Sequence, residues 1–487
     1  MPWLNRRFAV RAAMLGGAAS LCACTTVGPN FVSPAAPAPP GYAMAGDARP
    51  AIAELDPAAR AAGPWWRSLG SAGLDAVMGE ALAGNQTLAA ADATLQKARE
   101  EAAKARGGSA PQVDATASAE RERINTQVFG IPGFPSPTIN LFSVGATVSY
   151  DLDVFGGQRR RVETAQAAAE AEARRADAAY LTLTGDVALQ AVQIAGLRAQ
   201  IAAVGDILAD DRRNNAIVRA AEVAGGEAPS ANTSGQAQLA EDQALLPPLQ
   251  QRLATARHAL ALLVGQPPAA WRAPDFTVAD FKPPAHIPVA VPSQLVRGRP
   301  DIRAAEADLH ADTARVGVAQ ADLYPDIRLV AGAAQSALTP ESIFSFGSTG
   351  YNFGAALTAP IFNGGALRAE KRAAQAQARA SLAQYRQTVL AAFTQVADVL
   401  TALAHDDEEG AALAKAQATA QAALDDQRAA YRLGGGAFLP VVQAQRQLDR
   451  ARLALVEAQG QRLADIVTLY AATAADWREA PGSSSGS

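Results

Sequence analysis

The sequence predicts an α+β membrane protein in which strands with one apolar face lead into helices much longer than a globular domain needs. Residues 351–361 alternate apolar and polar side chains, which is the pattern of a strand with one apolar face. Residues 366–433 contain no proline and one glycine, among many Ala, Gln, Arg, Leu and Glu residues that favour helix. A helix of that length would extend roughly 100 Å, which suits crossing an aqueous compartment better than the interior of a globule.

An internal repeat is the second observation. Residues 142–154 alternate in the same way and lead into another proline-free run that extends to residue 228. The phenylalanines at the two strand-to-helix joints, Phe155 and Phe362, are 207 positions apart. Glycines at each joint allow the sharp change of backbone direction that the transition needs. These glycines are Gly156, Gly157, Gly364 and Gly365.

Each half of the repeat predicts one β-hairpin, so one chain supplies four strands. A strand with one apolar and one polar face fits a membrane barrel that is apolar outside and wet inside. Four strands cannot close a barrel, and open sheet edges are not tolerated in lipid, so several chains must share one barrel. The alternative is a soluble α+β protein with half-buried hairpins. The helix length and an export signal argue against it.

Residues 1–23 are typical of such a signal, because Arg6, Arg7 and Arg11 precede an apolar stretch. This stretch ends in the sequence LCAC at 21–24, which resembles the lipobox of bacterial lipoproteins. The resemblance implies that Cys24 is the lipidated first residue of the mature chain. The alternatives are a plain secretory signal and a membrane anchor, and the apolar run is shorter than the roughly 20 residues that a spanning helix needs. Thr25 replaces the aspartate that usually retains lipoproteins in the inner membrane, which favours the outer membrane.

Composition excludes several classes of function. The net charge of −4 and the absence of basic clusters argue against nucleic acid, and Cys24 alone remains after the signal, so no disulfide framework exists. No nucleophile–base constellation or phosphate loop indicates an enzyme or a cofactor. The histidines show no metal-ligand spacing, and the acidic run 405–409 is interpreted as a solvated stretch of helix. These histidines are His258, His286, His310 and His405.

The remaining elements follow from periodicity and from proline and glycine positions. In the first half we expect a helix at 74–106, a strand at 111–120, a loop at 124–138, a helix from 157 to about 224, a turn at 225–234, and a helix at 235–264 interrupted at Pro247-Pro248. In the second half we expect a helix at 300–322, strands at 326–335 and 351–361, a long helix at 366–433, a turn at 434–439 and a helix at 441–476.

Five short motifs carry a family resemblance. They are CTTVGPNF at 24–31 with Pro34, YDLDVFG at 150–156, RPDIRAAE at 299–306, PIFNGG at 360–365, and AQR at 444–446. In this order they resemble the TolC-like outer-membrane factors of tripartite pumps, NodT/OprM type, over almost the whole mature chain. The resemblance implies a homotrimer with a twelve-stranded β-barrel in outer-membrane lipid. It also implies a hollow helical barrel in the periplasm, a periplasmic adaptor, and an inner-membrane transporter, usually of the resistance-nodulation-division class.

This resemblance divides the chain into regions. Residues 1–23 are the signal peptide, 24–72 the lipidated tether, 265–295 an equatorial linker and 477–487 a flexible tail. The β-barrel hairpins are expected at 111–156 and 325–362. The helical barrel is expected at 73–110, 157–264, 296–324 and 363–476.

The resemblance also implies a periplasmic gate at the helix tips, formed by Leu439, Gln443 and Arg446, with Tyr431 on the entering helix. Spacings of four and three place the first three on one helix face. A ring of apolar side chains would exclude water by dewetting. Aspartate is common in the family at position 443, so Gln443 predicts a hydrogen bond to Arg446 instead of a salt bridge. The alternative interpretation of both polar residues is ordinary helix packing.

The expected function is a passive exit duct for drugs or other small solutes. Two alternatives stay open at this point: the outer channel of a type I protein-secretion system, and a trimeric coiled-coil surface protein without a pore. Polar residues on one strand face argue against the last. These are Ser143, Thr147, Ser149, Asn352 and Thr358.

Overall fold

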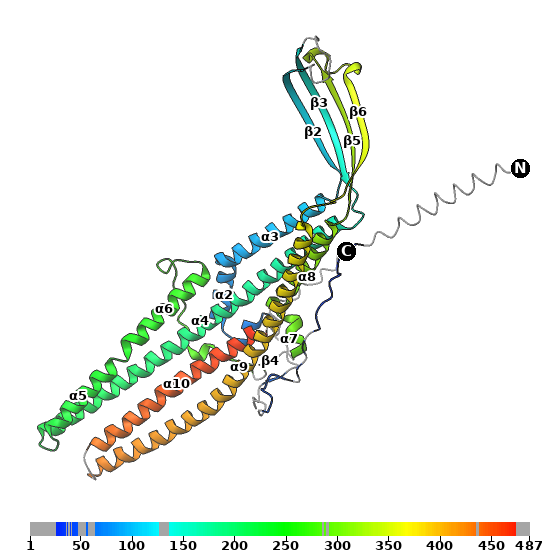
Figure 1. Ribbon diagram of the computed structural model, residues 1–487. Helices are drawn as coiled ribbons and strands as arrows, with labels where there is room; N and C mark the ends of the chain where they lie inside the picture. Colours follow the sequence, from blue (N-terminus) through cyan, green and yellow to red (C-terminus); the bar gives the residue numbers. More distant parts are fainter. Residues whose placement is uncertain are drawn as a thin grey trace, which may run out of the picture. The chain divides into compact units, whose positions relative to one another are not determined.

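The computed structural model describes residues 26–35, 37, 39, 41–46, 55–56, 64–125, 136–284, 287–288, 292–434 and 438–473 (Figure 1). The predicted signal peptide, Cys24, the tail 477–487, His286 and the middle of the loop 124–138 lie outside these residues. The chain divides into two compact units. Unit one comprises Met1–Pro34, Thr94–Ala173 and Ala304–Tyr385, and unit two comprises Ala35–Ala93, Arg174–Arg303 and Arg386–Ser487.

A four-stranded antiparallel sheet lies in unit one (Figure 1). Its strands, in spatial order, are β2 (Gln112–Arg123), β3 (Thr138–Asp151), β5 (Asp326–Ala337) and β6 (Thr349–Thr358). The β3–β5 pairing joins the two repeats, while β2 and β6 each have an unpaired edge within this chain. All four strands fall inside the two predicted hairpin ranges.

The sheet register separates an apolar from a polar face. One row of paired residues is entirely apolar and consists of Val113, Val148, Ala331 and Phe353. The next row is Asp114, Thr147, Gly332 and Asn352. Because successive residues of a strand point to opposite faces, these two rows lie on opposite sides of the sheet. Phe353 is 82% exposed and Val113 67%, so the apolar face is uncovered in a single chain.

The strand-to-helix joints combine glycines with side-chain caps. Gly156, Gly364 and Gly365 have φ of 79°, 61° and 88°, values that favour glycine, whereas Gly157 is simply the first residue of α4. Asp153 accepts hydrogen bonds from the amides of the first turn of α4, at 2.8 Å from Gln158 N and 2.9 Å from Arg159 N. The carboxylate therefore satisfies donors that the helix itself leaves free.

The helix predicted at 74–106 is two helices, so that prediction was wrong. They are α2 (Ala72–Gly84) and α3 (Gln86–Gly107), separated by Asn85 in an extended conformation. Asn85 Oδ1 accepts from Leu88 N at 3.0 Å, and Asn85 Nδ2 donates to Leu263 O at 2.8 Å. The asparagine caps the second helix and holds the break in place.

The first helical hairpin consists of α4 (Gly157–Val223), α5 (Pro229–Gln243) and α6 (Leu246–Val264). Its turn is shorter than the predicted 225–234, because Pro229 occupies the first turn of α5, where proline costs no hydrogen bond. The predicted interruption at Pro247-Pro248 lies at Ala244 and Leu245 instead, and the two prolines occupy the first turn of α6.

The second half repeats this plan. It contains α7 (Pro292–Gly298), α8 (Pro300–Ala321), α9 (Ala366–Arg432) and α10 (Leu439–Thr473), with α9 and α10 side by side in unit two (Figure 1). Helices α4 and α9 each include an 18-residue window apolar enough to cross a membrane. In α4 that window is 56% buried within the chain, which is ordinary for a core helix.

Aromatic residues form the core of unit two near its short elements. Trp65, in the 3-10 helix η2 (Trp65–Leu69), is fully buried and stacks on Tyr470 with ring centroids 5.3 Å apart. Ser68 Oγ donates to Tyr470 Oη at 3.0 Å. The region called a linker, 265–295, contributes β4 (Ile287–Pro288), which pairs in parallel with β1 (Leu55–Asp56). Strands of two residues are too short to show alternation, so the sequence did not predict them.

Residues 26–33 of the expected tether are fixed within unit one. Arg160 on α4, whose side chain is 3% exposed, donates to Val27 O at 3.2 Å and to Asn30 Oδ1 at 2.7 Å. The Phe31 ring stacks on His310 at 4.4 Å. The beginning of this extended segment is therefore packed against α4 and α8.

Candidate channel and helix-tip gate

The predicted gate residues lie where α9 and α10 meet in unit two. Tyr431 near the end of α9 is half-buried, and its ring contacts Phe438 edge-on at 5.0 Å. Phe438 is 4% exposed and belongs to a core cluster with Val218 of α4 and Leu424 of α9. Tyr431 thus packs into the chain's own core and closes the turn between the two helices.

Two of the other predicted gate residues share an exposed face. Leu439 is 59% exposed, and Gln443, one helical turn later, is exposed as well. Arg446 is half-buried, and its positive charge partly offsets the rise in the pKa of Asp211 of α4 that burial and Asp242 cause. No hydrogen bond joins Gln443 to Arg446 in the described part of α10. The spacing therefore brings Leu439 and Gln443 together and turns Arg446 toward α4.

A buried glutamine beside these residues, in the AQR motif at 444–446, was not predicted to be a site residue. Gln445 is 1% exposed, and its amide nitrogen donates to Asp210 Oδ2 at 3.1 Å and to Asp449 Oδ1 at 2.9 Å. Its amide oxygen accepts from Arg428 Nη2 at 2.9 Å. One side chain thus joins α4, α9 and α10.

The repeat itself carries the signal that would have found Gln445. Gln238, 207 positions earlier, donates from Nε2 to Asp242 Oδ2 at 2.7 Å. Gln445 and Asp449 have the same four-residue spacing as Gln238 and Asp242. A Gln–Asp pair repeated on both returning helices points to a structural polar network.

The two helix turns contact each other within unit two. The Glu227 carboxylate, in the α4–α5 turn, accepts a hydrogen bond from the backbone N–H of Phe438 at 3.0 Å. Asn232 Nδ2 of α5 donates to Glu222 Oε2 of α4 at 2.8 Å. The position of the Leu439 face therefore depends on both hairpins.

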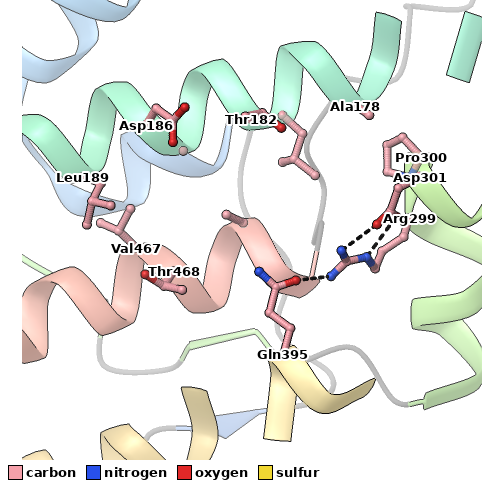
Figure 2. A pocket seen from close by; sticks show the side chains of 13 residues that line it. Ala178, Thr182, Asp186, Leu189, Arg299, Pro300, Asp301, Gln395, Val467 and Thr468 are labelled. Atoms are coloured by element: carbon pink, nitrogen blue, oxygen red, sulfur yellow. Dashed lines mark hydrogen bonds and ion pairs between the residues drawn. The ribbon is translucent and has the colours of Figure 1, made fainter. Parts of the chain in front are cut away.

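The motif at 299–306 has a structural role in a cavity of about 270 Å³ (Figure 2). The Arg299 guanidinium donates to Asp301 at 2.7 Å and to Gln395 Oε1 of α9 at 2.9 Å. It also donates to the backbone oxygen of Ala472 at 2.6 Å, near the end of α10. Figure 2 shows Arg299 reaching Gln395 and Asp301, while Asp186 projects from α4 elsewhere in the lining. Arg299 thus ties the start of α8 to α9 and α10.

The described histidines and the acidic run 405–409 have different contact partners. His310 contacts Glu163 at 2.9 Å, His405 contacts Glu408 at 3.5 Å on an exposed stretch of α9, and His258 is exposed on α6. Asp407 accepts from Arg462 of α10 at 2.6 Å. Among the residues that the structure describes, no group of three or more His, Cys, Asp and Glu side chains could hold a metal ion.

An open-edged sheet with one apolar face, continued by long helical hairpins, defines a membrane channel completed by several chains. The family model described as "Outer membrane efflux protein" matches residues 77–266 and 291–475. The chain belongs to this family of outer-membrane efflux proteins.

Individual relatives agree over most of their length. The pyoverdine export outer membrane protein OpmQ of Pseudomonas aeruginosa is 31% identical over 85% of this chain and 87% of its own. Nodulation protein T of Rhizobium leguminosarum bv. viciae is 28% identical over 96% of this chain and 93% of its own. The solved structure of the outer-membrane channel OprN superposes with a TM-score of 0.85 at 28% identity, over 93% of this chain and all of that one.

These similarities confirm the predicted family and fold class. A trimer in which each chain adds four strands to one twelve-stranded barrel is the arrangement known for this fold. It resolves the open edges of β2 and β6, because each edge pairs with a neighbouring chain.

Proposed function

We propose that this chain is the outer-membrane channel of a tripartite efflux pump, a passive duct that carries drugs or other small solutes from the periplasm to the exterior. The sheet register is the observation that carries the proposal. An apolar row beside a row of three polar residues and a glycine is what a barrel needs to face lipid outside and water inside. An inner-membrane transporter of the resistance-nodulation-division class and a periplasmic adaptor would supply the cargo and the energy.

Relatives support small solutes as the class of cargo. The related OpmQ is named for pyoverdine export, and a 28% identical relative of Escherichia coli is the cation efflux system protein CusC. These cargoes differ chemically while the channels are similar. A passive duct whose cargo is chosen by its transporter accounts for both observations.

The gate is proposed at the α9–α10 tip. In a symmetric trimer each position forms a ring of three. The exposed Leu439 side chains would form an apolar ring that excludes water, with the polar Gln443 ring one turn away. Tyr431 and Phe438 would support this ring from behind through their edge-on contact.

Lipid attachment at Cys24 is proposed to hold the chain in the outer membrane. Residue 26 lies only two positions further on, and a side chain at Gly156 would come within 2.7 Å of Thr26 Cγ2. Thr26 is therefore packed against the joint between β3 and α4. This position suits an acyl anchor next to the barrel.

Planar-bilayer conductance tests the duct and its gate together. The purified wild-type trimer should conduct poorly, because its tip is closed. We expect Leu439→Ser combined with Arg446→Ala to conduct strongly and to admit large hydrophilic antibiotics in cells without a transporter. The matched control is Glu408→Ala, an exposed carboxylate on the same pair of helices, which should behave as wild type.

Wild-type conductance of the double variant at normal trimer abundance would move the gate away from Leu439. If the trimer carries no current even when its helix tips are removed by proteolysis, the chain is not a duct. The pore-free surface protein would then be the better description.

A further inference from the structure

A pair of aspartates lies between α4 and α5, behind their turn in unit two. Asp211 of α4 is 7% exposed, and its Oδ2 has no hydrogen-bond partner among the described residues. Asp242 of α5 lies beside it and interacts with it through its carboxyl group. Figure 1 shows α5 running alongside α4 over its whole length. The two carboxyl groups therefore meet across the seam between the two helices.

The cations around this pair are mostly engaged elsewhere. Arg213 of α4 contacts Asp210 at 3.1 Å, Arg428 of α9 donates to Gln445, and Arg452 of α10 donates to Gln421 at 3.1 Å. Arg446 of α10 is the cation that acts on Asp211. The acidic groups that act on Asp211 are Asp242 and Asp449, and those that act on the nearby Asp449 are Asp210 and Asp242.

Two ionised carboxylates in contact have only acceptors, so neither can satisfy the other. One shared proton changes this, because the protonated group becomes a donor and the repulsion between like charges disappears. Burial first, and then the neighbouring Asp242 and Asp449, raise the pKa of Asp211 to about 7. Burial also raises the pKa of Asp449 to about 6. One proton held between the two carboxyl groups near neutral pH would therefore give the unpartnered oxygen of Asp211 a hydrogen-bond partner.

We propose that Asp211 and Asp242 share one proton that holds α5 against α4, and that loss of this proton releases the α4–α5 turn. At low pH the proton is present and the seam is closed by a carboxyl–carboxyl hydrogen bond. At higher pH two negative charges face each other in a buried site, and separation of the helices relieves them.

The contacts of the turn connect this seam to the proposed gate. Glu227 in the α4–α5 turn holds the backbone N–H of Phe438, the residue before Leu439. A loosened α4–α5 turn weakens this support of the α9–α10 turn. This consequence rests on the proposed function, whereas the shared proton itself does not.

Amide hydrogen exchange of the whole trimer, corrected for the intrinsic effect of pH on exchange, tests the proposal. In the wild type, protection of residues 225–243 should fall about ten-fold or more between pH 5.5 and pH 8.5, since one pKa unit corresponds to a factor of ten. Asp211→Asn keeps the shape of the side chain, and its amide N–H donates a hydrogen bond at both pH values because it does not titrate. That variant should stay protected at both pH values, whereas Asp211→Ala should exchange quickly at both.

A second carboxyl pair supplies the matched control. Asp406 of α9 lies beside Asp465 of α10, again with an unpartnered Oδ2, and Asp407, Glu409 and Arg462 are nearby. Asp406→Asn removes a half-buried carboxyl pair from the other hairpin. It should leave the pH dependence of residues 225–243 unchanged. Asp242→Asn repeats the main test if Asp211→Asn fails to fold.

Protection of 225–243 that does not change with pH in the wild type, or that changes equally in Asp211→Asn, overturns the proposal. Bilayer conductance distinguishes a failure of the shared-proton proposal from a failure of the gate proposal. If Leu439→Ser with Arg446→Ala conducts while Asp211→Asn exchanges like wild type, the duct stands and the shared proton does not. If exchange follows pH as expected while conductance does not, the shared proton stands and the gate lies elsewhere.

Discussion

Polar residues near the helix tips differ in role according to how deeply each is buried. Gln443 is exposed on the Leu439 face, while Gln445, two residues later, is 1% exposed and bonded to two aspartates. A buried amide that satisfies two carboxylates and an arginine is expensive to replace, because each partner would lose a hydrogen bond in a dry site. The exposed amide of Gln443 is free to interact with water or with a neighbouring chain.

At this scale the Asp406–Asp465 pair predicts a pH-dependent stability. Burial, and then Asp465, raise the pKa of Asp406 to about 7, well above its ordinary value of 3.8. The folded chain therefore binds a proton in this window that the unfolded chain does not, so the free energy of unfolding falls as pH rises from about 4 to about 7. Asp406→Asn should match the wild type in apparent unfolding temperature at pH 4 and exceed it by a few degrees at pH 8.

Thermal unfolding followed by circular dichroism at the two pH values checks this prediction. Glu408→Gln, at an exposed position on the same helix, is the control and should show no pH-dependent gain. An equal difference between Asp406→Asn and wild type at both pH values would contradict the proton linkage.

Among the elements, the strands show how pairing between repeats creates a continuous surface. Strand β3 from the first half pairs with β5 from the second, and this pairing aligns the apolar rows of both hairpins. Val148 lies in the apolar row and Thr147 in the polar row. Adjacent residues of one strand thus face opposite environments.

Arginine at these two neighbouring positions should have unequal effects. Val148→Arg places a charge toward lipid and should cost about 2–4 kcal/mol near the middle of the bilayer, while Thr147→Arg faces the lumen and should be tolerated. Trimer stability in urea, compared for the two variants at equal expression, measures the difference. Equal stabilities would mean that the assignment of the two faces is wrong.

The strands and long helices were predictable because their patterns extend over ten residues or more. Alternation of apolar and polar residues predicted β3 and β6, and long stretches without proline predicted α4 and α9. The break at Asn85 was missed, because the apolar residues on each side keep a helical spacing through it. For the predicted gate, spacing placed Leu439, Gln443 and Arg446 on one helix face, but only the first two are exposed, and Arg446 is half-buried near Asp211. Spacing did not predict that Tyr431 packs inward, because that contact depends on Phe438 beyond the turn.

For the whole molecule, the barrel is closed in two steps, first by the internal repeat and then by the trimer. Duplication supplies two hairpins that pair through β3 and β5, and three chains then supply the strands that close the barrel. Every strand edge is paired in the closed barrel, which lipid requires. Barrel closure therefore comes from sheet pairing between chains and does not depend on the acyl anchor.

Loss of the anchor should consequently leave the trimer intact. Residues 26–33 are held by Arg160 and by the stacking of Phe31 on His310, contacts that do not involve the acyl chains proposed on Cys24. A Cys24→Ala chain exported by a non-lipoprotein signal should still reach the trimeric state, with reduced outer-membrane abundance at most, because one anchor adds little to a spanning barrel. Mass spectrometry verifies that the lipid is absent, and cross-linking followed by size-exclusion chromatography measures assembly. Recovery of soluble monomer alone would show that the anchor is needed to bring the strands of three chains together in the membrane.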